Sequence, residues 1–210
     1  MSEAKLSEAK DDGAMRIEPV TLEGSVVRLE PLRRDHYAAL CAIALDPELW
    51  RFNPTKLSTP DDVARRIELM LDAQERGTEL PFVTVERASG TVVGSTRYMN
   101  IDVANQRVEI GNTWIAKPWQ RTAINTEAKY LMLRHAFESW HCYRVELKTD
   151  VLNEQSRAAI LRIGAQQEGI LRRHVVTWNG RVRDTVYFSI LDHEWPAVKT
   201  ELERKMRYFR

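Results

Sequence analysis

The stretch from Glu109 to Lys129 reads EIGNTWIAKPWQRTAINTEAK. Its pattern predicts a strand that ends at Ile115, a turn broken by Lys117-Pro118, and a helix that starts at Asn125. A helix start presents unbonded N–H groups and about half a positive charge, so it can hold a diphosphate. The alternative is that Asn125 only caps the helix, and the spacing alone leaves both open.

Gly111 lies inside the predicted strand. A glycine at such a place often marks a β-bulge or a close approach of another group to the backbone. A bulge here would splay this strand from the next one, residues 143–149, and would open a slot in the sheet. The alternative is that Gly111 only eases the twist of the strand.

The rest of the chain supplies the other layers of the fold. Periodicity, helix caps and turn residues predict strands over 26–29, 81–87, 91–99, 106–115, 143–149, 171–178 and 182–191, and helices over 35–45, 59–76, 125–140 and 153–163. The last two strands are joined by Asn179-Gly180, a strong hairpin signal. The helix at 125–140 crosses between two strands, which predicts a parallel pair in a mixed sheet.

Composition limits the class of protein. The 210 residues carry 31 Lys+Arg against 30 Asp+Glu, which argues against a protein that works mainly through phosphate-backbone electrostatics, so we expect no nucleic-acid partner. We find no apolar run of membrane-spanning length and no apolar signal core at the N-terminus. Two cysteines cannot build a disulfide framework, so we expect a cytoplasmic protein.

Several common chemistries leave no trace in the sequence. The glycines at 164 and 169 have P-loop spacing but lack the Lys and Ser/Thr that must follow, and neither GxGxxG nor GxSxG occurs. The five histidines show no zinc-ligand spacing, so we expect no metal site.

With these features in place, the chain resembles the GNAT acyltransferase superfamily, and within it the RimJ/RimL-type protein N-acetyltransferases. The resemblance covers about 22–195. It rests on the order and spacing of Val27-Arg28-Leu29-Glu30-Pro31-Leu32, Glu109-Ile110-Gly111, Trp114-Ile115, Asn125-Thr126-Glu127-Ala128-Lys129, His135-Ala136-Phe137, Asn153-Glu154-Gln155-Ser156-Arg157, Gly164-Ala165, Glu168-Gly169 and Arg183-Asp184.

The resemblance implies a mixed α/β fold, with a twisted, mostly antiparallel sheet, a central splayed pair of parallel strands, and helices on both faces. Acetyl-CoA would lie in the split as a co-substrate. The implied cofactor-binding residues are Trp114, Ile115 and Ala116 along the pantetheine arm, Gln120, Arg121, Thr122, Ala123, Ile124, Asn125 and Thr126 at the pyrophosphate, and Asn153 and Ser156 beside the thioester.

The chain departs from the superfamily's pattern in two ways. The superfamily's pyrophosphate loop usually carries glycines where this chain has Ala123 and Asn125. Residues with side chains let the ligand approach the backbone less closely and adopt a left-handed backbone conformation less readily. Many members also place a tyrosine acid where this chain has Ile160, so Ser156 becomes the candidate donor to the leaving thiolate. Our candidate base is Glu109, acting directly or through water.

A purely structural role stays open for each candidate residue. Glu109 would otherwise be a surface carboxylate paired with Arg107, and Ser156 a residue of the first helical turn. Asn153 can cap its helix and contact pantetheine at once. We expect Lys129 to be an exposed helix residue, and we expect Trp50, Phe52 and Tyr98 to be core aromatics rather than an acceptor pocket.

The leading hypothesis is an acetyl-CoA-dependent N-acetyltransferase that acts on a protein N-terminus or a small primary amine in a ternary complex. Its rivals are the same fold with succinyl-CoA or another acyl-CoA, and a non-catalytic CoA-binding module. We assign 1–20 to a flexible tail, 21–195 to the acetyltransferase domain and 196–210 to a charged C-terminal helix. Oligomeric state stays open, with a homodimer suggested by the resemblance alone.

Overall fold

The computed structural model describes residues 15–207. Its strands are β1 Leu22–Glu23, β2 Val27–Pro31, β3 Leu80–Glu86, β4 Thr91–Asp102, β5 Arg107–Ile115, β6 Arg144–Asp150, β7 Gln166–Val176 and β8 Val182–Leu191. Its helices are α1 Tyr37–Ala44, α2 Pro60–Glu75, α3 Ala123–Arg134, α4 Glu154–Arg162 and α5 Trp195–Arg207. A π turn, His135–Ser139, continues α3, and 3-10 turns lie at Arg34–His36, Pro47–Trp50, Lys117–Trp119 and Asp192–Glu194.

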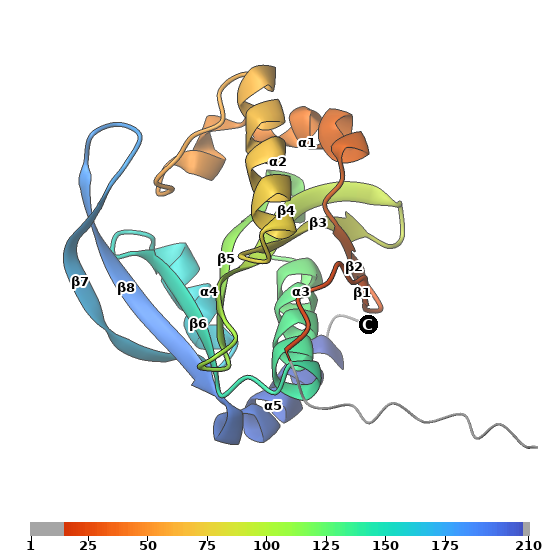
Figure 1. Ribbon diagram of the computed structural model, residues 1–210, viewed down its shortest axis with the longest axis vertical. Helices are drawn as coiled ribbons and strands as arrows, with labels where there is room; N and C mark the ends of the chain where they lie inside the picture. Colours follow the sequence, from red (N-terminus) through yellow and green to blue (C-terminus); the bar gives the residue numbers. More distant parts are fainter. Residues whose placement is uncertain (1–14, 208–210) are drawn as a thin grey trace, which may run out of the picture.

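One eight-stranded sheet organises the molecule, in the order β1-β2-β3-β4-β5-β6-β8-β7. The predicted parallel pair is confirmed as β5–β6, and every other recorded pair of neighbours is antiparallel. The mixed α/β class and the helices on both faces are likewise confirmed, with α1 and α2 on one face and α3 and α5 on the other (Figure 1).

Each face of the sheet has its own core, and β3 contributes to both. Its side chains alternate, because Phe82 belongs to the cluster under α3 and α5, whereas Val83 and Val85 belong to the cluster under α1 and α2. Among the described residues, no helix has the length and hydropathy of a membrane span.

The helix starts follow their capping residues. Thr59 caps α2 and forms a reciprocal capping box with Asp62, as the sequence indicates. The start of α3 differs from the prediction: Thr122 is the cap, and the helix begins at Ala123, two residues before Asn125. The hydroxyl of Thr122 accepts the N–H of Ile124 at 3.3 Å, which Asn125 inside the first turn cannot do.

The predictions for residues 15–20 and for the start of β7 also need correction. Residues 15–20, which were assigned to a flexible tail, belong to the folded body: Met15 is buried, and the carbonyl of Arg16 accepts the indole N–H of Trp140 at 2.9 Å. The rest of the predicted tail lies outside the described residues. Strand β7 begins at Gln166, five residues earlier than predicted, and two register irregularities along it mask the alternation that the prediction relied on.

A buried carboxylate fastens α3 to the first strands. The Oε1 of Glu127 accepts the N–H of Ser25, and its Oε2 accepts the N–H groups of Val26 and Val27, at 2.9, 2.6 and 2.7 Å respectively. Carboxylates with several backbone donors make strong, directional contacts. This contact therefore sets where α3 lies over β2.

Lys129 is buried rather than exposed, which corrects the expectation for this residue. Its Nζ donates to Thr113 Oγ1 at 2.5 Å, and Thr113 Oγ1 also lies 2.7 Å from Thr96 Oγ1. Burial lowers the pKa of Lys129 to about 7. The helix therefore carries an amine that is largely deprotonated above neutral pH.

This burial predicts a pH-dependent stability. The folded pKa lies below the unfolded value, so between about pH 7 and 10.5 the unfolded chain binds the extra proton and stability rises with pH. We expect Lys129→Met to remove this rise, which amounts to about 1–3 kcal/mol between pH 7 and 9.5. Urea unfolding at both pH values measures it, with Lys117→Met at an exposed position as the control. Equal slopes in both variants would contradict the buried amine.

Candidate active site

Strands β5 and β6 separate soon after they meet. They pair only at Arg107–Glu109 with Arg144–Glu146. From Ile110 to Ile115, β5 has no recorded partner on this edge, although β4 continues beside its other edge. The sheet thus contains the predicted split, and it opens toward the carboxyl ends of both strands (Figure 1).

A β-bulge lies at the start of the split. Arg97 pairs with Gly111 and Ser95 with Trp114, so β5 has one residue more than β4 in this interval. Asn112 takes up the extra length with a left-handed φ of 50°. A Cβ on Gly111 would lie 2.6 Å from Met99 Sδ and 2.9 Å from Glu109 Oε1, so the glycine also permits a close approach.

The turn before α3 explains why two expected glycines are dispensable. Arg121 has φ 62°, so the left-handed position falls one residue before the cap Thr122. Ala123 and Asn125 are already helical, and ordinary side chains suit that backbone. The first-turn N–H groups of α3 project from the open end of the split, where the helix dipole favours an anion.

Three other predicted cofactor residues, Gln120, Thr126 and Ala116, already make hydrogen bonds within the protein. Gln120 connects β5 to α4 at the open end of the split. Its Nε2 donates to Ile115 O at 2.9 Å, and its Oε1 lies 3.5 Å from Gln155 Nε2 on α4. Thr126 is 2% exposed, and its hydroxyl accepts from Arg162 at 3.3 Å. The N–H of Ala116 donates to the carbonyl of Val93 on β4, so this group is not free for a ligand.

Asn153 and Ser156 lie at the start of α4, directly after β6. Asn153 caps the helix, since its Oδ1 accepts the N–H of Ser156 at 3.0 Å. The Ser156 hydroxyl has no hydrogen-bond partner within residues 15–207 and is partly exposed. It is therefore available to a ligand.

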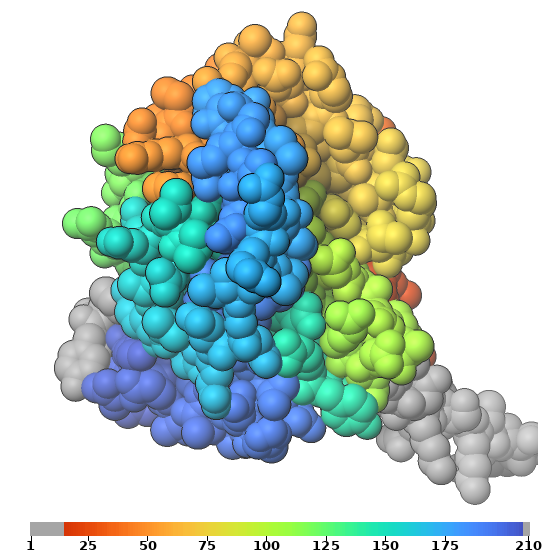
Figure 2. Space-filling model, turned by 90° about the vertical axis from the view of Figure 1, so that its left-hand side faces the viewer, coloured from red at the N-terminus to blue at the C-terminus, as the bar shows by residue number. Residues whose placement is uncertain are grey.

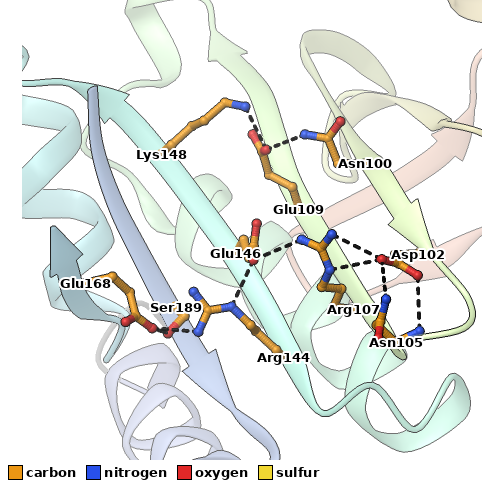
Figure 3. A network of polar contacts seen from close by, with 10 residues as sticks. All are labelled: Asn100, Asp102, Asn105, Arg107, Glu109, Arg144, Glu146, Lys148, Glu168 and Ser189. Carbon is orange, nitrogen blue, oxygen red and sulfur yellow. Dashed lines mark hydrogen bonds and ion pairs between the residues drawn. The ribbon is translucent and has the colours of Figure 1, made fainter. Parts of the chain in front are cut away.

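Glu109 lies at the last paired position of β5, where the split begins. It is 2% exposed, and its Oε2 accepts from Asn100 Nδ2 and Lys148 Nζ, each at 2.8 Å (Figure 3). The alternative pairing with Arg107 is wrong, because Arg107 contacts Asp102 and Glu146 instead. Within the described chain, Oε1 of Glu109 has no donor, so this oxygen can accept a proton from a ligand or a water.

Sequence reasoning missed Lys148 and Asn100. Lys148 was detectable, because β6 alternates polar Arg144, Glu146, Lys148 and Asp150 with the buried Val145 and Leu147. Such alternation puts the four polar side chains on one face. Asn100 has φ 50° beside a register irregularity, which a pattern of strand residues does not reveal.

The turn of the β7–β8 hairpin reaches the segment after α1, on the face of the sheet opposite to α3. The indole N–H of Trp178 donates to Trp50 O at 3.1 Å, and Lys56 Nζ lies 4.7 Å from the centre of the Trp178 ring. Figure 2 shows the hairpin running along this side, with its upper end against the segment after α1. Tyr98 is core, as expected, and its hydroxyl donates to Met132 O.

The arrangement suits transfer from an extended, phosphate-bearing donor to an amine. An anion-binding helix start lies at the open end, a strand edge lies along the split, and a carboxylate lies where the split begins. The described residues contain no cluster of three or more His, Cys, Asp or Glu that could hold a metal.

Comparison with known proteins agrees with this geometry. Residues 27–166 match the acetyltransferase (GNAT) domain family. "Putative ribosomal N-acetyltransferase YdaF" of Bacillus subtilis is 38% identical over 110 residues, which span 52% of this chain and 59% of that protein. A GCN5-related N-acetyltransferase from Brucella melitensis is 32% identical with a TM-score of 0.81, over 90% of this chain and 86% of that one.

Mycobacterium smegmatis RimJ in complex with CoA-disulfide is 25% identical with a TM-score of 0.80, over 91% of this chain and 97% of that one. The family match spans most of the sheet, both strands of the split and the two helices that follow them. The chain therefore belongs to the GNAT acetyltransferase family, in its RimJ/RimL-like branch, and is a transferase.

Proposed function

We propose that this protein is a cytoplasmic, acetyl-CoA-dependent N-acetyltransferase that modifies a protein N-terminus or a small primary amine in a ternary complex. The single observation that carries the proposal is the split between β5 and β6, with the first turn of α3 at its open end, where only the N–H of Ile124 is bonded by the cap. The name of the Bacillus relative refers to a ribosomal acceptor, and we take from it only the wider class of protein amines.

The binding roles follow from position. The turn Gln120–Asn125 would hold the pyrophosphate through backbone N–H groups. The edge of β5 up to Ile115 would run beside the pantetheine arm, and Asn153 with Ser156 would flank the thioester. Thr126 contributes only its backbone, because its hydroxyl already binds Arg162.

Deprotonation of the acceptor favours an α-amine. At pH 7 a lysine ammonium costs about 4.6 kcal/mol to deprotonate, against about 1 kcal/mol for an α-amine of pKa near 7.7. Glu109 is the candidate base, directly or through one water, with its free Oε1. Lys148 holds its other oxygen, so the carboxylate keeps one orientation.

The leaving group needs a proton. When the amine nitrogen bonds to the acetyl carbon and the C–S bond breaks, the sulfur leaves as a thiolate. Ser156 is the candidate donor, because its hydroxyl is unpaired in the described structure and it lies in the first turn of α4, which follows β6. Ile160, at the position where many relatives are expected to place a tyrosine, is buried and apolar.

A titration separates the proposed enzyme from its rivals. We expect calorimetry to show binding of acetyl-CoA, and amine-dependent release of free thiol with acetyl-CoA in preference to succinyl-CoA. Binding without turnover for any acyl-CoA would favour a non-catalytic module. Absence of binding would refute the enzyme and the module together.

The role of Glu109 is tested by Glu109→Gln. We expect kcat to fall about 100-fold at pH 7, with the loss shrinking as pH rises and the amine deprotonates on its own. Steady-state thiol release across pH 6–9.5 measures it. Glu146→Gln is the matched control, because Glu146 lies opposite Glu109 on β6 but is already paired with Arg107 and Arg144. A change below twofold in kcat/KM would exclude Glu109 as the base.

Ser156→Ala tests the donor to the thiolate. We expect kcat to fall about tenfold or more while calorimetric affinity for acetyl-CoA stays the same, because Asn153 still caps the helix through a backbone N–H. Ser156→Cys, which restores an acidic hydrogen, should recover part of kcat. Equal rates for Ala and wild type would assign Ser156 to the helix alone.

A further inference from the structure

A narrow hollow lies on the opposite face of the sheet from α3, between α1, α2 and the strands β4 and β5. Most of its wall is apolar, from Leu40, Ala44, Trp50, Leu57, Val63, Ile67, Met70 and Trp114. The accessible space is about 20 Å³. That is room for about one water molecule, or for one oxygen of a group that enters from outside.

Two arginines line this apolar hollow, and only one of them has an ion-pair partner among the described residues. Arg97 Nη1 lies 2.8 Å from Glu79 Oε2, and the Arg97 side chain is 8% exposed. Its Nε is buried and has no hydrogen-bond partner within residues 15–207. Arg66 has neither an ion pair nor a hydrogen bond to any described residue, although it lines the same hollow.

Arg66 and Arg97 bring two positive charges to the hollow, and the charges of Glu79 and Glu109 oppose them. Both arginines line the hollow, and burial, followed by the charge of Arg66, lowers the pKa of Arg97 to about 10. Burial also lowers the pKa of Arg66. A buried donor without a partner, here the Nε of Arg97, is costly, and a carboxylate matches the guanidinium fork in geometry and charge.

The hollow adjoins the reacting end of the site. Met99 pairs with Glu109 and Arg97 pairs with Gly111, so Glu109 and Arg97 project from the same face two residues apart along the sheet. Asn112, the extra residue of the bulge, lines the hollow. The charge of Glu109 also reaches Arg97, where it opposes the effect of burial.

We propose that the hollow formed by Arg66, Arg97 and Trp114 is a specificity subsite for a carboxylate on the amine acceptor. This inference rests on the proposed function and names its substrate class. The carboxylate enters between the two guanidinium groups, and the apolar wall excludes water from around it. The source of the carboxylate is either an acidic side chain near a peptide N-terminus or the carboxyl group of a free amino acid.

Matched acceptors test the subsite. One arm compares short peptides that begin with Glu or with Gln, and the other compares free amino acids with their amides. Calorimetry in the presence of CoA gives Kd, and thiol release from acetyl-CoA gives kcat/KM. We expect the carboxylate member of one pair to be favoured about tenfold or more in both readouts. The arm that shows the preference identifies the source.

The variant Arg66→Met removes the unpaired cation and leaves the Arg97–Glu79 pair intact. We expect it to abolish the preference while the amide acceptors keep their values. Arg65→Met is the matched control, since Arg65 is the neighbour on α2 with 70% of its side chain exposed. Thermal unfolding of both variants shows that they are folded.

The outcomes are distinct. No preference in wild type, or the same preference in Arg66→Met and Arg65→Met, overturns the subsite. Turnover of amines without a charge preference keeps the proposed function and rejects the subsite. A charge preference in Kd that only Arg66→Met abolishes, without turnover of any acceptor, keeps the subsite and rejects the proposed function.

Discussion

The short parallel contact between β5 and β6 is the constraint on which the site depends. Three residues of each strand pair, and the strands then part, so a sheet that is continuous elsewhere exposes a backbone edge in its centre. An exposed edge in the middle of a sheet is unfavourable unless something occupies it. Here the two following helices start at the open end, and each brings a polar helix start toward the gap.

The position of α3 is fixed by a carboxylate rather than by packing alone. Glu127 takes three backbone N–H groups of the β1–β2 region, and Gly24 leaves room for it, since a Cβ there would lie 2.5 Å from the carboxylate carbon. Two residues further along the helix, Lys129 is buried under the bulge with only hydroxyl partners recorded. The helix thus holds two buried ionisable groups, of which one is strongly bonded and the other is desolvated.

Much of this could be predicted from local pattern. The helix caps at Thr59 and Asn153, the Asn179-Gly180 hairpin and the crossover that makes β5–β6 parallel are all encoded within a few residues. Gly111 indicated a bulge or only an eased twist, and the resemblance to the GNAT superfamily turned this into the prediction of a split.

What failed depended on contacts distant in sequence. The burial of Lys129 is set by Thr96 and Thr113, which are 33 and 16 residues away. The partner of Glu109 is Lys148 on the neighbouring parallel strand, 39 residues on, so the nearby Arg107 was the wrong choice. The two arginines that line the hollow lie on α2 and β4, and no spacing within the chain relates them.

The bulge at Asn112 connects the two faces of the site. In a regular strand, residues five apart project from opposite faces. In β5 the extra residue reverses this: Glu109 and Trp114, five apart, both lie toward α1 and α2, whereas Ile110 and Ile115 both enter the core under α3. One inserted residue therefore puts the carboxylate and the indole on the same side, while the free edge of the same strand borders the split. A single strand can thus serve a donor along its edge and an acceptor on its face.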